Sequence, residues 1–203
     1  AVKVTEKDLE RLFGTSDLET LARIARQVEA GKKNPRGAGR KRRFSLQDVV
    51  NMKALQKAGV TQAAIAKQYG TSRQTVSAGF RRLQDFTDHP AADMRIFYMH
   101  GNQLCSIIDV DHRGEKIAVH NVTEKPLLTA FGVKKEPLWE DYQRFLRERC
   151  FPESRAHSRQ ILRDMGVSFF DAENIIEKTF GKMAGDQHWM LAVHNRKAGE
   201  QHA

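Results

Sequence analysis

Residues 72–82 carry side chains that can hydrogen-bond to the edges of DNA bases. Arginine and glutamine recognise guanine and adenine through paired hydrogen bonds in the major groove. The residues expected to contact DNA from this segment are Ser72, Arg73, Gln74, Thr75, Ser77 and Arg81. The pattern predicts a helix that reads bases, with Gln62 and Arg82 holding the phosphate backbone and fixing the register.

The residues just before this segment predict a helix-turn-helix. In the first helix Ile65 and Ala66 face inward, and the small Ala66 allows the two helices to cross closely. Gly70 suits a turn that requires a positive φ angle, and Ser72 is a good N-cap for the second helix. Residues 62–82 therefore combine the spacing of a helix-turn-helix with the side chains of a DNA reader.

The distribution of charge supports this interpretation independently. The chain has 34 Lys and Arg residues and 25 Asp and Glu residues. Residues 32–90 hold 13 basic and 3 acidic residues, whereas residues 1–31 hold 5 and 6, and residues 91–203 hold 16 of each. The whole positive surplus coincides with the helix-turn-helix and the segment before it, which is typical of a phosphate-binding module. The alternative is a basic run that is only a solvated face or a linker.

A basic segment, GKKNPRGAGRKRR, occupies residues 31–43 and contains three Gly, one Pro and seven Lys or Arg. Nothing in it can pack into a core, so we expect a mobile arm before DNA binds. Such arms enter the minor groove beside a helix in the major groove. The arm residues expected to contact the groove or the phosphates are Arg40, Lys41, Arg42 and Arg43.

The run GRKRRFSLQDVVNMKALQKAGVTQAAIAKQYGTSRQTVSAGF resembles the C-terminal DNA-binding domain of serine recombinases and DNA invertases. That family joins a Gly-Arg-rich arm to three helices, the third of which reads the major groove. The resemblance covers about residues 39–83 and implies arm contacts at Arg40 and Lys41, with base reading by Ser72, Arg73 and Gln74. Only 38 residues precede it, too few for a recombinase catalytic domain, so we expect a binding module without recombinase activity.

Residues 5–31 are predicted to be helical in two pieces, with Ser16 and Glu19 forming a capping box before the second piece. Apolar residues then recur at helical spacing, at Leu18, Leu21, Ala25 and Val28. This stripe either packs against the helix-turn-helix or forms the seam of a homodimer. A homodimer is expected because palindromic sites are read by two-fold symmetric proteins.

A second interpretation concerns residues 4–50. The elements LERLFGTS and RKRRFSLQDVV resemble the winged-helix region of MerR regulators, in which the first pair of helices would read DNA. Asp17 and Glu19 would then face phosphates at the start of the reading helix, which is electrostatically unfavourable.

From residue 94 the hydrophobic pattern changes to that of strands. Strands at 94–100 and 103–110 flank the tight turn Gly101-Asn102, and a third strand is predicted at 116–122. These segments predict a three-stranded antiparallel meander, to which a last short strand at 188–193 returns.

Three helices are predicted between the third and the last strand. Pro137 begins the first helix, with Leu138 and Tyr142 among its inward-facing residues. Pro152 begins the second helix, and Asp171 caps the third.

The predicted fold class is α+β: an all-α helix-turn-helix domain followed by a small α+β domain with an antiparallel meander and about three helices. The predicted divisions are N-terminal helices for packing or dimerisation at 1–31, a basic arm at 32–44, the helix-turn-helix at 45–88, a regulatory or dimerisation domain at 92–195, and a disordered tail at 196–203.

The motifs RCFPESR at 149–155 and KTFGKMAGDQHWM at 178–190 resemble the segment that precedes the kinase core in HipA-like proteins of Gram-positive bacteria. The resemblance covers about residues 94–193, although residues 182–185 depart from the family's Leu-Ser-Leu-Ser and no kinase core follows. It implies a small regulatory or interaction domain of mobile elements, without phosphoryl transfer. The implied interaction pocket comprises Ser154, Arg155, Asp186, Gln187 and Trp189. Alternatively, Trp189 fills the core and Asp186 caps a turn.

The sequence carries no motif of an enzyme. No two His lie at i, i+4 within a predicted helix, and neither a phosphate-binding glycine loop nor Gly-x-Ser-x-Gly occurs. We therefore expect no catalytic residue, no metal and no cofactor. Asp109 and Asp111 either bind a cation or are turn and edge residues.

Cys105 and Cys150 have no metal-like spacing and are expected to be reduced, buried thiols in a cytoplasmic protein. No apolar run approaches the roughly 20 residues that cross a bilayer, and no signal-peptide core is present, so no membrane contact is expected.

These patterns predict a sequence-specific double-stranded DNA-binding transcriptional regulator, such as a repressor, of a bacterium or mobile element that acts as a homodimer. Two other classes stay open. One is a DNA-architectural or recombination-accessory protein, and the other is an adaptor whose C-terminal domain recruits a protein partner.

Overall fold

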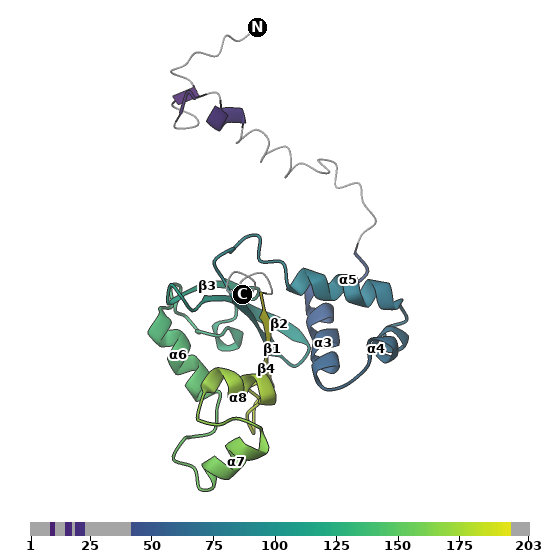
Figure 1. Ribbon diagram of the computed structural model, residues 1–203, viewed down its shortest axis with the longest axis vertical. Helices are drawn as coiled ribbons and strands as arrows, with labels where there is room; N and C mark the ends of the chain where they lie inside the picture. The colour runs from purple at the N-terminus through teal and green to yellow at the C-terminus, as the bar shows by residue number, and fades with distance from the viewer. Residues whose placement is uncertain (1–8, 11–14, 18, 23–41, 196–203) are drawn as a thin grey trace. The chain divides into compact units, whose positions relative to one another are not determined.

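The computed structural model describes residues 9–10, 15–17, 19–22 and 42–195, and the chain divides into two compact units, 1–43 and 44–203 (Figure 1). In the first unit the backbone N–H of Thr20 donates to Asp17 Oδ2 over 2.8 Å. The N–H of Leu21 donates to the Asp17 carbonyl. The prediction that Ser16 caps this helix is therefore wrong. The N-cap is Asp17, one residue later, because its carboxylate accepts the N–H of Thr20. The predicted stripe at Leu18, Ala25 and Val28 and the predicted tail at 196–203 lie outside the described residues.

A four-stranded antiparallel sheet, counted over the described residues, runs through the second unit. Its strands are β1 (Met94–His100), β2 (Gln103–Asp111), β3 (Lys116–Asn121) and β4 (His188–His194), in the order β3-β2-β1-β4. β1 and β2 form the expected hairpin, and β4 returns beside β1 with Met94 opposite His194. The predicted meander with a returning last strand is confirmed.

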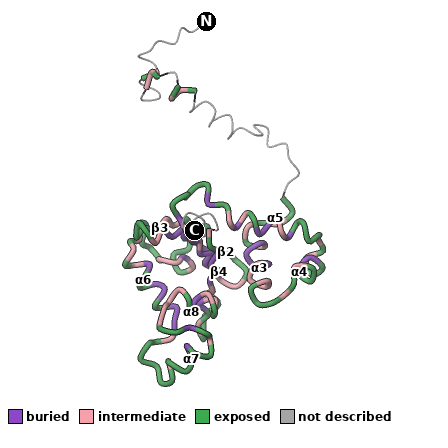
Figure 2. Tube along the Cα trace, viewed as in Figure 1, coloured by how far each residue is buried: buried purple, intermediate pink, exposed green. Residues whose placement is uncertain are grey.

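Both faces of the sheet are covered, and alternate residues of β1 and β4 enter different cores. Ile96 and Tyr98 of β1 belong to one core, which we call the α6–α8 core. Phe97 and Met99 belong to the other, the helix-turn-helix core. β1, β2 and β4 are accordingly buried along most of their length, whereas the edge strand β3 is half-buried or exposed (Figure 2). Burial on both faces explains why MRIFYMH is nearly continuously hydrophobic, a pattern typical of strands without a solvated face.

The helices of the helix-turn-helix cover one face of the sheet (Figure 1). They are α3 (Leu46–Lys57), α4 (Gln62–Gln68) and α5 (Arg73–Leu83). Val50 of α3 and Leu83 of α5 share one hydrophobic cluster with Leu191 of β4. The segments 45–88 and 92–195, which the sequence suggests as separate domains, are therefore joined by a common core within one compact unit.

The helices that follow the meander lie on the opposite face. They are the 3-10 helix η1 (Pro126–Leu128), α6 (Trp139–Glu148), α7 (Ser158–Asp164) and α8 (Ala172–Thr179). Tyr142 of α6, Leu162 of α7 and Ile175 of α8 all enter the α6–α8 core. The structure is thus α+β, as predicted, with helices on both sides of one sheet.

Two details of these helices differ from the prediction. Pro152 does not begin a helix: Arg155 and Ser158 close successive turns, and His157 has a φ of 63°, so α7 begins only at Ser158. Leu138 does not face inward but is the exposed N-cap residue of α6, where its N–H donates to the side chain of Asp141. A leucine at this position starts the helix through its backbone, so its side chain is left in solvent.

Candidate nucleic-acid interface

α5 is fixed at its N-terminus by its own capping residue. Ser72 is the N-cap, and its Oγ accepts the backbone N–H of Thr75 over 3.2 Å. Further along α5, Val76, Phe80 and Leu83 are buried in the helix-turn-helix core. The helix therefore has one packed face and begins at a defined residue, which fixes what its outer face presents.

The turn before α5 depends on a glycine. Gly70 has a φ of 59°, in the left-handed region that favours glycine. Its N–H donates to the Lys67 carbonyl over 3.1 Å, and the N–H of Thr71 donates to the Ala66 carbonyl over 2.8 Å. These two bonds satisfy the last carbonyls of α4 in a Schellman motif, so the chain leaves α4 in a set direction.

The contact between α5 and α3 requires a second glycine for a different reason. A Cβ added at Gly79 would lie 3.2 Å from both methyl carbons of Val49, so the two helices already approach as closely as side chains allow. Ala66 of α4 is also buried, as the sequence predicts for a small residue at the helix crossing. The positions of the three helices relative to one another are thus set by packing.

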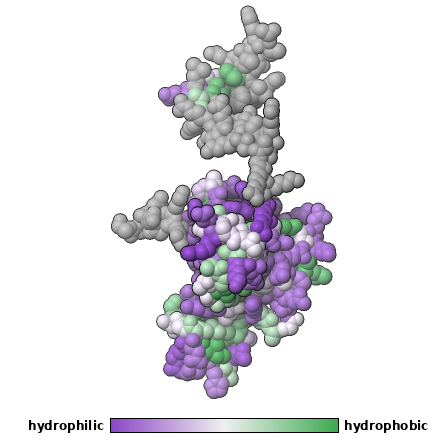
Figure 3. Space-filling view, turned by 90° about the vertical axis from the view of Figure 1, so that its right-hand side faces the viewer, coloured by the Kyte–Doolittle hydropathy of each residue, from purple (hydrophilic) through white to green (hydrophobic). Residues whose placement is uncertain are grey.

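The predicted base-contacting residues mostly lie at the surface. Ser77 is half-buried, and the exposed residues are Ser72, Arg73, Gln74, Thr75 and Arg81. Hydrophilic residues dominate the face of the molecule that carries α3–α5 (Figure 3). The arrangement presents polar and cationic groups at the N-terminal turn and at the end of α5.

The two residues predicted to hold the DNA backbone, Gln62 and Arg82, are half-buried. Arg82 Nη1 donates to the carbonyl of Phe44 over 3.3 Å. The Phe44 ring packs edge-on against Tyr69, with 6.0 Å between ring centroids. Arg82 therefore holds the residue that follows the basic arm, a structural role that the sequence alone does not reveal.

The basic arm is described only at its C-terminal end. Arg42 and Arg43 are exposed, whereas Arg40 and Lys41 lie outside the described residues.

The five residues of the predicted interaction pocket lie on two segments of the chain, the loop before α7 and the start of β4 with the turn that leads into it. Ser154 and Arg155 are exposed on the loop before α7, and Gln187 is exposed before β4. Asp186 pairs with the buried Arg149 over 2.5 Å and accepts the N–H of His188, as a turn cap does. Trp189 Nε1 donates to the Gly101 carbonyl over 2.7 Å.

Arg149 is the residue that the sequence did not single out in this region. Besides its ion pair with Asp186, its Nε donates to the Gly181 carbonyl over 3.1 Å and its Nη2 to the His188 carbonyl over 2.8 Å. The pKa of Asp186 is lowered, chiefly by the hydrogen bond from Arg149. This buried cation therefore ties α6 to the start of β4.

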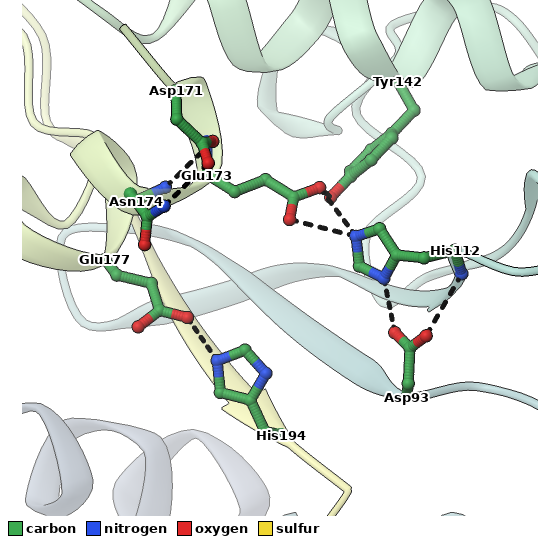
Figure 4. Close-up of polar contacts among 8 residues, drawn as sticks. All are labelled: Asp93, His112, Tyr142, Asp171, Glu173, Asn174, Glu177 and His194. Atoms are coloured by element: carbon green, nitrogen blue, oxygen red, sulfur yellow. Dashed lines mark hydrogen bonds and ion pairs between the residues drawn. The ribbon is translucent and has the colours of Figure 1, made fainter. Parts of the chain in front are cut away.

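Sequence patterns also do not reveal a polar cluster beside α8, formed by Asp93, His112, Tyr142 and Glu173 (Figure 4). His112 Nδ1 lies 2.5 Å from Asp93 Oδ1, and His112 Nε2 lies 2.8 Å from Glu173 Oε1. Tyr142 donates its hydroxyl to the same Glu173 oxygen over 2.7 Å. The hydrogen bond with Glu173, aided by Asp93, raises the pKa of His112 to about 9. The imidazole is therefore protonated at neutral pH and links the sheet to α8 as a cation; it is not poised to act as a general base.

The other side chains that the sequence offers for chemistry, Asp109, Cys105 and Cys150, are buried within the fold. Asp109 is buried in β2 and accepts from Arg95 Nε over 2.5 Å, so its carboxylate forms a cross-strand ion pair. Cys105 and Cys150 are buried and free, as predicted, and burial raises the pKa of Cys150 to about 11. In the described ranges no group of three or more His, Cys, Asp or Glu side chains is placed to hold a metal ion. No helix there has the length and apolar character that crossing a membrane requires.

Comparison with known proteins gives a match to the helix-turn-helix region. A family model described as the helix-turn-helix domain of resolvase matches residues 39–76. The match spans the end of the arm, α3, α4 and the start of α5, so the predicted resemblance to recombinase DNA-binding domains is confirmed. The chain thus contains a DNA-binding helix-turn-helix domain. Neither the curated proteins nor the solved structures provide a match.

Proposed function

We propose that this protein is a sequence-specific double-stranded DNA-binding regulator of transcription that reads bases with α5. The observation that carries the proposal is the exposed first turn of α5, where Arg73 and Gln74 follow the capping Ser72. In helix-turn-helix proteins the N-terminal residues of the second helix meet the base edges. Arg and Gln at these positions supply the paired donors and acceptors that distinguish guanine and adenine.

Contacts to the phosphates would come from the basic residues around this helix. The arm residues Arg40, Lys41, Arg42 and Arg43 anchor in the minor groove and on phosphates. Arg82, together with Gln62, holds the backbone and fixes the register. Support comes from the charge distribution, because residues 32–90 hold 13 basic and only 3 acidic residues. These contacts supply affinity without sequence preference, whereas the first turn of α5 supplies the preference.

The proposed assembly is a homodimer on a two-fold symmetric site. Half-sites would then lie about 34–36 Å apart, or a multiple of that distance, so that both reading helices enter the major groove from one side. Sedimentation equilibrium of the full chain on a selected duplex would give two chains per duplex if this is correct. One chain per duplex would contradict it.

The test of base reading begins with duplexes selected from a random pool by the full chain. Fluorescence anisotropy then compares the selected duplex with a scrambled one across a salt titration. We expect a preference of ~10³-fold or more that the S72A/R73A/Q74A variant loses. The matched control is Q160A/R163A/S168A, which removes the same residue types from exposed positions on the other side of the sheet. A triple variant of α5 that keeps the preference would contradict the proposal.

The family description favours one alternative, a DNA-architectural or recombination-accessory role, because the matched domain is that of resolvases. Such a protein would bend its site and leave a promoter unaffected. A regulator would change expression from a promoter that contains the selected site. Measuring both the bend and the reporter output distinguishes the two functions.

A further inference from the structure

A cavity of about 410 Å³ opens where the helix-turn-helix meets the sheet. Three half-buried aromatic side chains contribute to its walls: Tyr69 at the end of α4, Phe180 after α8 and Trp189 of β4. The rings of Phe180 and Trp189 meet edge-on, with 6.3 Å between their centroids. Such walls suit a flat, largely apolar ligand, because aromatic rings pack well edge to face or offset.

The charged residue that lines the cavity determines which charge a ligand should carry. Lys182 is the only charged residue among the described residues that line it, and none of them is acidic. The Lys182 Nζ lies 5.8 Å from the centroid of the Phe180 ring, which places the ammonium over the aromatic wall. A second cavity, of about 550 Å³ beside α6 and α8, is instead lined by Glu153, Asp171 and Glu173 together with Arg147. Of these two cavities, the first therefore favours an anion.

Hydrogen bonds hold the two sides of this cavity in place. Asn51 Nδ2 of α3 donates to the Asn102 carbonyl in the β1–β2 turn over 3.2 Å. Trp189 Nε1 donates to the Gly101 carbonyl in the same turn. Both Asn51 and Asn102 line the cavity, so its walls are already positioned without a ligand.

We propose that this cavity binds a small aromatic carboxylate. The ring lies among Tyr69, Phe180 and Trp189, and the carboxylate pairs with the Lys182 ammonium. The volume accommodates a ligand of one or two rings, and the single cation matches a single negative charge.

Occupancy of the cavity is linked to DNA binding, a consequence that rests on the proposed function. Tyr69 immediately precedes the turn glycine, Gly70, and its ring packs against Phe44, the residue that follows the basic arm. A ligand in contact with Tyr69 therefore touches the residue that joins the turn to the base of the arm. Ligand and DNA must then change each other's affinity by the same factor.

The experiment uses the full chain and three probes of one shape: benzoate, neutral benzyl alcohol and the benzylammonium cation. Ligand-observed NMR titrations give their dissociation constants for the wild type, for K182Q and for the matched control K178Q. Lys178 is exposed on α8 and does not line the cavity. In the W139F chain, Trp189 is the remaining tryptophan, so its emission reports whether the probe enters this cavity.

We expect benzoate to bind about tenfold more tightly than benzyl alcohol, and benzylammonium to bind most weakly. K182Q should remove the preference for benzoate, K178Q should keep it, and benzoate should change the Trp189 emission. Equal binding of the three probes, equal behaviour of K182Q and K178Q, or an unchanged Trp189 emission would overturn the site.

The linkage is tested by repeating the benzoate titration with the selected duplex bound. A shift in the benzoate dissociation constant, matched by the same shift in DNA affinity, supports the linkage, and identical constants with and without DNA overturn it. If the chain binds no duplex, the proposed function fails, while the titrations without DNA still decide the carboxylate site.

Discussion

The two helical layers of this protein use charged residues in opposite ways. On one face of the sheet, the helix-turn-helix packs its apolar residues inward and exposes Arg73 and Gln74 at the first turn of α5. On the other face, charges pair within the protein, as Arg149 does with Asp186 and His112 does with Glu173. The same sheet thus supports one layer whose reading helix turns Arg73 to solvent and one layer whose least exposed charges, those of Arg149 and His112, are paired within the protein.

This difference indicates which layer meets a polyanion. The exposed Arg73 at the start of α5 is available to phosphates and bases. A buried arginine that already holds a carboxylate and two carbonyls stabilises the fold instead. Substitutions in the first layer should therefore change DNA binding, and substitutions in the second should change stability.

The largest effect is expected for R149A. The substitution removes the ion pair with Asp186 and leaves the carbonyls of Gly181 and His188 without their donor. We expect a loss of about 3 kcal/mol in the free energy of unfolding, at the lower end for a broken buried pair because Asp186 is partly exposed. Urea denaturation measures this loss. The control is R144A, an exposed arginine on the same helix whose solvent-screened pair with Asp141 should contribute far less. Equal losses in the two variants would show that the buried pairing adds nothing.

A pH-dependent effect is expected from His112. Its pKa is raised from 6.5 to about 9, so its stabilising contribution is fully present below pH 6.5 and is lost as the pH rises through about 9. The free energy of unfolding should fall by about 1–2 kcal/mol over this range, less than the whole shift implies because the side chain is 35% exposed. H112Q should lack this part of the pH dependence in urea denaturation at a series of pH values. His194, whose pKa is raised by Glu177, supplies a residual slope of the same sign in both proteins. Parallel curves for wild type and H112Q would contradict the prediction.

The two layers also offer a matched pair of helix caps. Ser72 caps α5 and Asp171 caps α8 through hydrogen bonds to the N–H groups of the first helical turn. S72A and D171A should each lower the free energy of unfolding by about 1 kcal/mol, measured by urea denaturation. Only S72A should also weaken DNA binding of the folded protein, because the first turn of α5 is the proposed reader. A D171A variant that weakens DNA binding as much as S72A would remove the distinction between the layers.

The smallest effect is expected at the arm. R42A should weaken binding to all duplexes alike and lower the slope of log affinity against log salt by about one unit, because one phosphate contact is lost. Anisotropy titrations on the selected and scrambled duplexes measure this slope. K135A, which removes an exposed cation from the loop before α6, should leave the slope unchanged. A loss of sequence preference in R42A would assign base reading to the arm.

The helix-turn-helix could be predicted from the sequence because its signals are local. Gly70 marks the turn, Ser72 marks the start of α5, and Ile65 and Val76 mark the inward faces of α4 and α5. The first two strands could be predicted equally well, because Gly101-Asn102 separates two hydrophobic runs. In each case a few neighbouring residues determine the structure.

The contacts between distant segments could not be predicted in this way. The packing of α3–α5 on the sheet depends on the alternate side chains of β1 and β4, which a nearly continuous hydrophobic run does not assign to either face. The cluster around His112 draws on Asp93, Tyr142 and Glu173 from separate elements, and no spacing in the chain relates them. The prediction at Pro152 is wrong although its signal is local. Proline is common at the start of a helix, but His157 adopts a left-handed conformation and α7 begins only after it, at Ser158.

The central claim is that α5, and not the opposite layer, lies against DNA. Differential thiol labelling tests it directly, because the native Cys105 and Cys150 are buried and an introduced cysteine is the reactive one. Q74C places a thiol on the first turn of α5, and Q143C places one on the exposed side of α6. We predict that the selected duplex slows labelling of Q74C severalfold and leaves Q143C unchanged. Protection of Q143C with Q74C still reactive would contradict the account.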